Sequence, residues 1–364
     1  MKVVVVGAGY AGTIAANRLA RKTGDARITV LNPRTDFVER VRLHEQVAAT
    51  GTAATPLGAM LARGITTRLG TVDKVGDGSV ALGDGGSETF DYLFLAVGST
   101  VEALPGTVAV GTWEGADLAR SALAALPAGS TVTVVGGGLT GIETAAEIAE
   151  ARPDLCVRLV GEVIGATLSE GGRRRVHAGL RRLRVEVVED TVAQVRPGPG
   201  RLGGVVCLRT GAELASDLTL WAIVAHVPDL AACSGLAVNA EGRAVVDEYL
   251  RSVSDPRVFV IGDCAAVPGA RMSCETAVAQ GAHAADTLAR ILAGEDPEPY
   301  SMGYTAQFLS LGRRDGLVQL SRRDDTTRRL YVAGRPAAVL KERVSRYAKH
   351  STRTADYSWL SGPK

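Results

Sequence analysis

A glycine-rich stretch at the N-terminus carries the first chemical signal in the sequence. In KVVVVGAGYAG, four consecutive valines are followed by Gly7, Gly9 and Gly12. A short, continuous apolar run is typical of a strand buried on both faces, and the glycines allow a sharp turn into a helix. Without side chains at these positions, backbone N–H groups at the positive end of the helix can approach a pyrophosphate closely. The stretch predicts a phosphate-binding turn that also includes Tyr10 and Ala11.

The same pattern occurs a second time, in TVTVVGGGLTGIE. Gly136, Gly138 and Gly141 have the same spacing and follow a predicted strand at residues 131–135. A single match of this kind is weak, because glycine-rich turns after valine-rich strands are common. Two matches about 130 residues apart predict two dinucleotides, each bound in its own α/β unit.

The strand that follows each glycine-rich turn must position a residue near the ribose of its nucleotide. The predicted strand 27–31 ends at Asn32, where an acid is usual; the amide oxygen of Asn32 can still accept a hydrogen bond. In the second unit, Glu162 favours NADH, because a carboxylate pairs with the ribose diol and repels a 2′-phosphate. The arginines at 173–175 leave NADPH open, since they could accept that phosphate.

Two polar positions follow in the first unit, between Asp36 and Glu45. Arg42 is predicted to contact a cofactor from this charge-dense segment, and His44 is a candidate to donate a hydrogen bond or relay a proton. A return strand predicted at residues 90–99 contains Gly98, which allows close backbone approach.

The segment VFVIGD predicts a further buried strand that ends at Gly262 and Asp263. A carboxylate at such a strand end can accept hydrogen bonds from a sugar alcohol. The helix predicted at residues 275–292 carries Gln280, a second weak catalytic candidate, and its positive N-terminus could stabilise an anionic ring.

Composition excludes several classes of function. The net charge of +2 gives no electrostatic reason to expect nucleic acid as a partner. The predicted strand begins within two residues of the N-terminus, which leaves no room for a cleavable leader and predicts a cytoplasmic protein. The five cysteines include no C-x-x-C pair, so no metal site is expected; Cys264 and Cys274 are notable only because they follow VFVIGD.

The order of these motifs resembles the two-dinucleotide flavoprotein oxidoreductases over nearly the whole chain. FLSLGRRDGLVQL, at residues 308–320, is most similar to the branch with type II NADH dehydrogenases, apoptosis-inducing-factor-like proteins and ferroptosis-suppressor quinone reductases. The resemblance implies that the first glycine motif and Asp263 hold FAD, while the second motif and Glu143 receive the nicotinamide nucleotide. Asn32 and WAIV, at residues 221–224, depart from the family pattern.

The resemblance implies an FAD-dependent NAD(P)H oxidoreductase that passes hydride from nicotinamide to flavin and electrons on to a quinone-like small acceptor. Disulfide reductases of the superfamily often carry a redox cysteine pair in the N-terminal domain, where this chain has no cysteine, so a disulfide substrate is not expected. Two alternatives stay open: a flavoenzyme acting on a biosynthetic metabolite, and a redox-responsive flavin-binding interaction module.

The expected fold is α/β, with two Rossmann-like dinucleotide-binding domains and a small C-terminal α+β domain. The first domain comprises residues 1–108 and 229–298, the nicotinamide domain residues 109–228, and the C-terminal domain residues 299–364. Residues 337–350 predict a basic amphipathic helix with Leu340, Val344 and Tyr347 on one face. It could contact a membrane peripherally, pack on its own protein, or pack on a second subunit of a homodimer.

Overall fold

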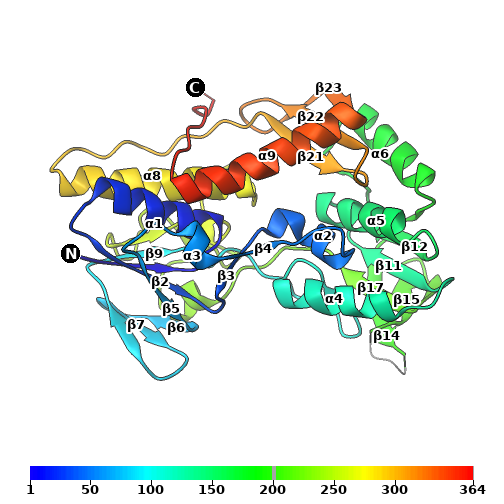
Figure 1. The fold of residues 1–364 in the computed structure, drawn as a ribbon, viewed down its shortest axis with the longest axis horizontal. Helices are drawn as coiled ribbons and strands as arrows, with labels where there is room; N and C mark the ends of the chain where they lie inside the picture. Colours follow the sequence, from blue (N-terminus) through cyan, green and yellow to red (C-terminus); the bar gives the residue numbers. More distant parts are fainter. Residues whose placement is uncertain (199–201, 364) are drawn as a thin grey trace.

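The computed structural model describes residues 1–198 and 202–363. Two α/β units lie side by side, and a C-terminal segment extends along both of them (Figure 1). The sequence expectation of a mixed α/β fold built on parallel sheets is therefore confirmed.

The first unit is built on a parallel five-stranded sheet with the order β19-β9-β1-β2-β5. Val3 and Val5 of β1 face the helices α1 and α8, while Val4 and Val6 face the opposite side of the sheet. All four valines are at most 4% exposed, as the unbroken apolar run predicts. The elements are β1 (Lys2–Val6), α1 (Tyr10–Lys22), β2 (Arg27–Asn32), β5 (Thr66–Leu69), β9 (Tyr92–Leu95), β19 (Val258–Val260) and α8 (Cys274–Leu292).

The second unit repeats this arrangement, with the parallel order β10-β17-β11-β12-β13. In each sheet, the strand before the glycine loop has two neighbours. β1 lies between β2 and β9, and β11 lies between β12 and β17, so one neighbour follows directly in the chain and the other comes much later. This reversal of strand order creates a crevice at the carboxyl ends of the strands. The elements are β10 (Val108–Ala109), α4 (Trp113–Ala125), β11 (Thr131–Val135), α5 (Leu139–Ala151), β12 (Cys156–Gly161), α6 (Glu170–Arg182), β13 (Glu186–Glu189) and β17 (Leu218–Trp221).

Small antiparallel sheets and short helices complete the two units. The sheet β6-β7-β8 covers the face of the first sheet that α1 and α8 leave free, and β14-β15-β16 packs on the second unit. The elements are β3 (Asp36–Val38), η1 (Arg40–Arg42), α2 (Leu43–Val47), β4 (Ala54–Pro56), α3 (Leu57–Met60), β6 (Val72–Val75), β7 (Ser79–Leu82), β8 (Ser87–Thr89), β14 (Val192–Pro197), β15 (Gly204–Leu208), β16 (Glu213–Ser216), α7 (Leu230–Cys233), β18 (Ala244–Val245) and β20 (Ala265–Ala266).

The C-terminal segment consists of an antiparallel sheet and a long helix. The sheet contains β21 (Ala306–Ser310), β22 (Gly316–Ser321) and β23 (Thr327–Ala333), and α9 (Arg335–Thr354) follows it. In Figure 1, α9 runs from this sheet across the top of the molecule to α1, against which it packs. The predicted amphipathic helix therefore packs on its own chain, although Leu340 and Tyr347 remain 40% and 50% exposed.

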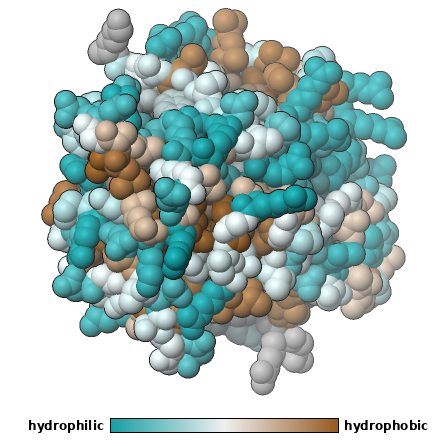
Figure 2. Space-filling model, turned by 60° about the vertical axis from the view of Figure 1, so that its left-hand side comes forward, coloured by the Kyte–Doolittle hydropathy of each residue, from teal (hydrophilic) through white to brown (hydrophobic). Residues whose placement is uncertain are grey.

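The surface mixes hydrophilic and hydrophobic residues, and the face in Figure 2 carries scattered hydrophobic groups among hydrophilic ones. Within residues 1–198 and 202–363, no helix combines the length and apolar composition needed to cross a bilayer.

Candidate functional site

A large cavity, of about 1530 Å³, extends over the carboxyl ends of both parallel sheets and reaches α9. Individual ligand sites typically enclose about 300–1,000 Å³, so this volume can hold more than one ligand. The predicted site residues that line it are Gly7, Gly9, Tyr10, Ala11, Asn32, His44, Gly98, Gly136, Gly138, Glu143, Glu162, Gly262 and Asp263.

The three glycines of the first loop have different local reasons for being glycine. A Cβ on Gly7 would lie 2.4 Å from the Ala96 carbonyl oxygen, and one on Gly12 would lie 1.9 Å from the Gly7 oxygen. Protein packing therefore excludes a side chain at both positions. A Cβ on Gly9 would have no protein atom within 4 Å, so the chain itself does not require glycine there.

The second loop shows the same division of roles. A Cβ on Gly141 would lie 1.8 Å from the Gly136 oxygen, whereas one on Gly138 would meet nothing within 4 Å. Gly9 and Gly138 are also the N-cap residues of α1 and α5, and neither helix receives a side-chain cap. Each loop therefore presents open space and uncapped helix N–H groups to the cavity, which fits a nucleotide phosphate.

Asn32 supports the first loop directly. Its Oδ1 accepts a hydrogen bond of 3.0 Å from the Ala8 N–H, and its Nδ2 donates to the Arg34 carbonyl oxygen over 2.8 Å. The side chain therefore joins the end of β2 to the glycine loop. Its predicted contact with a ribose remains a prediction.

A polar group that the sequence did not suggest surrounds Asp263. Ser99 Oγ donates to Asp263 Oδ2 over 2.6 Å, and Arg40 Nη1 donates to Ser99 Oγ over 2.8 Å. All three residues line the cavity. Gly98 and Gly262, with φ of +71° and +80°, form the turns that bring Ser99 and Asp263 together.

Four predicted residues lie outside the lining of the cavity: Gly12, Arg42, Gly141 and Gln280. Gln280 is fully buried, and its Oε1 accepts from the Gly262 N–H over 2.7 Å. It is therefore placed to hold the turn before Asp263. This buried position gives no support to the predicted catalytic role of Gln280.

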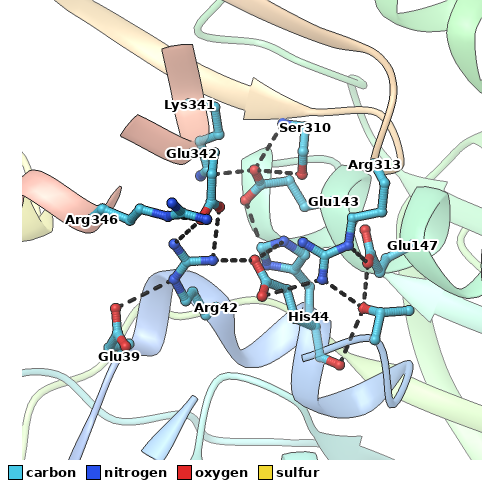
Figure 3. A network of polar contacts seen from close by, with 12 residues as sticks. Glu39, Arg42, His44, Glu143, Glu147, Ser310, Arg313, Lys341, Glu342 and Arg346 are labelled. Atoms are coloured by element: carbon cyan, nitrogen blue, oxygen red, sulfur yellow. Dashed lines mark hydrogen bonds and ion pairs between the residues drawn. The ribbon is translucent and has the colours of Figure 1, made fainter. Parts of the chain in front are cut away.

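Arg42 is directed away from the cavity into a cluster of carboxylates. Its Nη1 donates to Glu45 over 2.8 Å and to Glu342 over 2.9 Å, and its Nε lies 3.4 Å from Glu39 (Figure 3). The expected cofactor contact by Arg42 thus has no support from its position. Arg40, two residues earlier, lines the cavity instead, because the short helix η1 turns the two side chains to different sides.

Glu143 and Lys341 form a buried ion pair at the wall of the cavity. Lys341 Nζ lies 2.9 Å from Glu143 Oε1, which also accepts from the Ser310 N–H and Oγ. Burial raises the pKa of Glu143, but Lys341, His44 and Ser310 together outweigh that effect and hold the pKa below its ordinary value. Glu143 is therefore a carboxylate held by the C-terminal segment, and its contact with nicotinamide stays a prediction.

The end of β12 provides the predicted contact for the second ribose. Glu162 lines the cavity there, whereas none of the arginines at 173–175 is among the described lining residues. Arg174 pairs with Glu170, and Arg175 pairs with Asp315. The divergent segment 221–224 also lines the cavity, next to the second glycine loop.

Apolar and aromatic side chains line the cavity beside Lys341. They come from η1, the segment before α8, α9 and the chain after α9: Val41, Met272, Val344, Tyr347, Ala348 and Tyr357. The Tyr347 and Tyr357 rings lie 6.1 Å apart between centroids. This end of the cavity therefore combines an apolar, partly aromatic wall with the Glu143–Lys341 ion pair.

The two cysteines near this region are free thiols. Burial raises the pKa of Cys264 to about 11 and that of Cys274 to about 12. Both are therefore poor nucleophiles at neutral pH. Among the described residues, no cluster of histidine, cysteine and acidic side chains is arranged to hold a metal ion.

Comparison with known proteins places these features in a family. Residues 1–281 match the family model for pyridine nucleotide-disulphide oxidoreductases. An NADH dehydrogenase-like protein of Mycobacterium tuberculosis is 32% identical over 309 residues, covering 75% of this chain and 74% of the relative. Ferroptosis suppressor protein 1 of Taeniopygia guttata is 27% identical over 345 residues, covering 88% and 89%.

Solved structures show the same architecture. The sulfide:quinone oxidoreductase of Aquifex aeolicus superposes with a TM-score of 0.79 at 16% identity, covering 98% of this chain and 92% of that one. Identity this low supports the fold and not the substrate. The chain belongs to the pyridine nucleotide-disulphide oxidoreductase family, and it is an oxidoreductase that binds FAD and a nicotinamide nucleotide.

Proposed function

We propose that this oxidoreductase uses NADH to reduce a quinone or a similar flat, small acceptor by way of FAD. The observation that carries the proposal is the pair of open glycines, Gly9 and Gly138, that face one cavity from two uncapped helices. When bound, FAD supplies a group that accepts hydride and gives up the electron pair to a second substrate. The residues of the chain bind, orient and shield the reactants.

The first loop and the Arg40–Ser99–Asp263 group are the proposed FAD contacts. Helix N–H groups at Gly9 suit the pyrophosphate, and Asp263 suits the hydroxyls of the ribityl chain. The second loop is the proposed site of the nicotinamide nucleotide. Glu162 favours NADH there, because its carboxylate matches a ribose diol and repels a phosphate.

The acceptor is proposed to bind beside α9. A quinone ring is flat and apolar with carbonyl oxygens at its edge, and this matches the Tyr347 and Tyr357 wall beside the Lys341 ammonium. The charged pair could then interact with the oxygen that gains negative charge during reduction. Peripheral membrane contact through Leu340 and Tyr347, and a homodimer, are further proposals that this site does not depend on.

Two glycine variants test the proposal. Gly9 and Gly138 have φ of −79° and −75°, which alanine also adopts, and a Cβ at either position would meet no protein atom. We expect Gly9→Ala to yield folded but colourless protein. Gly138→Ala should remain yellow and resist bleaching by NADH under anaerobic conditions.

The wild-type protein is the reference for both variants: NADH should bleach its flavin bands, and a soluble quinone should restore them. Circular dichroism establishes that each variant is folded. Wild-type protein that is not bleached by NADH or NADPH would contradict the proposal. Bleaching without reoxidation by any quinone would contradict only the acceptor, and would favour a metabolite as substrate.

A further inference from the structure

The polar network in Figure 3 places an imidazole between two carboxylates. His44 Nδ1 lies 4.0 Å from Glu143 Oε2, and His44 Nε2 lies 4.0 Å from Glu45 Oε1. The three residues are only 6–7% exposed. His44 and Glu143 line the cavity, whereas Glu45 lies behind them. The imidazole therefore joins the cavity wall to a buried carboxylate.

The charged groups that face His44 come from several elements. Glu143 belongs to α5, Glu45 to α2, Lys341 to α9, and Arg313 to the turn between β21 and β22. Burial lowers the pKa of His44, and the opposing effects of the two carboxylates do not compensate. The imidazole is therefore neutral at neutral pH, with a proton on one nitrogen only.

Glu45 is a fixed carboxylate behind the imidazole. Its carboxylate accepts from Arg42 over 2.8 Å and lies 3.2 Å from Arg313, so it acts as a fixed acceptor. The carboxylates of Glu45 and Glu143 lie at the same distance of 4.0 Å from Nε2 and Nδ1, so each imidazole nitrogen faces an acceptor. In this arrangement the neutral imidazole can take up a further proton on the nitrogen that carries none.

We propose that His44 holds the proton that the acceptor draws from water in each turnover, and that Glu45 is its positioning residue. This inference rests on the proposed function. NADH supplies two electrons and one proton, whereas conversion of a quinone to a hydroquinone consumes two electrons and two protons. The second proton is taken from solvent by His44, passes from its Nδ1 to Glu143 Oε2, and passes from the Glu143–Lys341 pair to the acceptor oxygen. The imidazole then returns to its neutral form.

Two acceptors separate proton supply from electron transfer. Ferricyanide takes single electrons and no proton, so its reduction by NADH does not need His44. We expect His44→Gln to slow quinone turnover by about 10²-fold, the scale of a lost acid-base group, while ferricyanide turnover stays within about twofold of wild type. His177→Gln, a change on α6 outside the cavity lining, should alter neither rate.

The pH profile gives a second measurement. Quinone turnover by wild-type protein should fall as pH rises, because a smaller fraction of His44 is protonated, and this dependence should be absent in His44→Gln. Glu45→Gln keeps the imidazole but weakens its orientation, so we expect a smaller loss with quinone and a shifted inflection.

Equal slowing of both acceptors in His44→Gln would show a structural role and overturn the inference, as would unchanged quinone turnover. If the wild-type protein reduces ferricyanide but no quinone, the proposed acceptor is wrong, and the proposed proton supply by His44 is wrong with it. If the wild-type protein reduces quinone and His44→Gln reduces it equally fast, only the proposed proton supply by His44 is wrong.

Discussion

At the scale of single residues, each glycine loop contains a glycine that protein packing requires and one that only a bound ligand would require. Gly12 and Gly141 have no room for a methyl group, because carbonyl oxygens of Gly7 and Gly136 occupy that space. Gly9 and Gly138 have room. The motif leads to the expectation of this division, with Gly9 where the backbone approaches the phosphates and Gly12 where the helix packs close to the strand.

This difference leads to a prediction about stability. Gly12→Ala should lower the free energy of unfolding by several kcal/mol or prevent folding, because its Cβ would overlap the Gly7 oxygen at 1.9 Å. Gly9→Ala should stay within about 1 kcal/mol of wild type when both proteins lack FAD. Urea denaturation of the FAD-free proteins measures both changes. Equal destabilisation by the two variants would contradict this division of roles.

Glu162 leads to a prediction about the nicotinamide donor. Glu162→Gln removes a charge from the edge of the cavity, so it should raise the KM for NADH and reduce the preference for NADH over NADPH by about tenfold. Steady-state kinetics with both donors and ferricyanide measures this ratio. Glu170→Gln, on α6 and outside the cavity lining, is the matched control. An unchanged ratio would point to other residues as the source of the preference.

At the scale of elements, Asp315 ties the turn before β22 to α6. Its carboxylate accepts from Arg175 over 2.5 and 2.6 Å and also from Arg182. Burial raises the pKa of Asp315, but the two arginines outweigh it and hold the pKa below its ordinary value. The contacts of Asp315 with the two arginines therefore stabilise the attachment of the C-terminal sheet to the second unit whenever Asp315 is ionised.

The sign of the resulting pH dependence follows from the lowered pKa. Stabilisation is complete above the ordinary aspartate pKa of about 3.9, and it is lost as pH falls through the lower pKa of the folded state. Asp315→Asn should cost about 1–3 kcal/mol at neutral pH and much less at the acid end. Thermal unfolding of wild type and variant between pH 7 and the acid limit of folding measures this. Asp296→Asn, at an exposed position, should show no such convergence.

The elements themselves could largely be predicted from the sequence, but their long-range contacts could not. The valine runs and glycine turns fix β1, β11 and the helices after them by local rules. The sequence predicts a return strand at residues 90–99, but only Tyr92–Leu95 forms β9, because the chain beyond it turns to reach the cavity. One partner of Arg42 and one of Glu143 lie on α9, so no local pattern could indicate that Glu342 and Lys341 hold them.

At the scale of the whole molecule, the first unit, the second unit and the C-terminal segment all contribute walls to one cavity. A ligand that fills it binds the folded chain and not the unfolded one. FAD at 100 times its Kd should therefore stabilise the protein by about 2.7 kcal/mol, which for a chain of 364 residues corresponds to a rise in Tm of about 3–4 °C. Calorimetry of FAD-free protein with and without FAD measures this. A Tm independent of FAD would contradict binding in the cavity.

The order of strands in the first sheet has a consequence for synthesis on the ribosome. β19 pairs with β9, with Val258 opposite Leu93, yet the entire second unit is translated between these two strands. At about 5–20 residues per second, β9 waits on the order of ten seconds with one hydrogen-bonding edge open. The nascent N-terminal part of the first unit is thus exposed to wrong strand pairing until β19 emerges, and slower translation of the second unit would lengthen that interval.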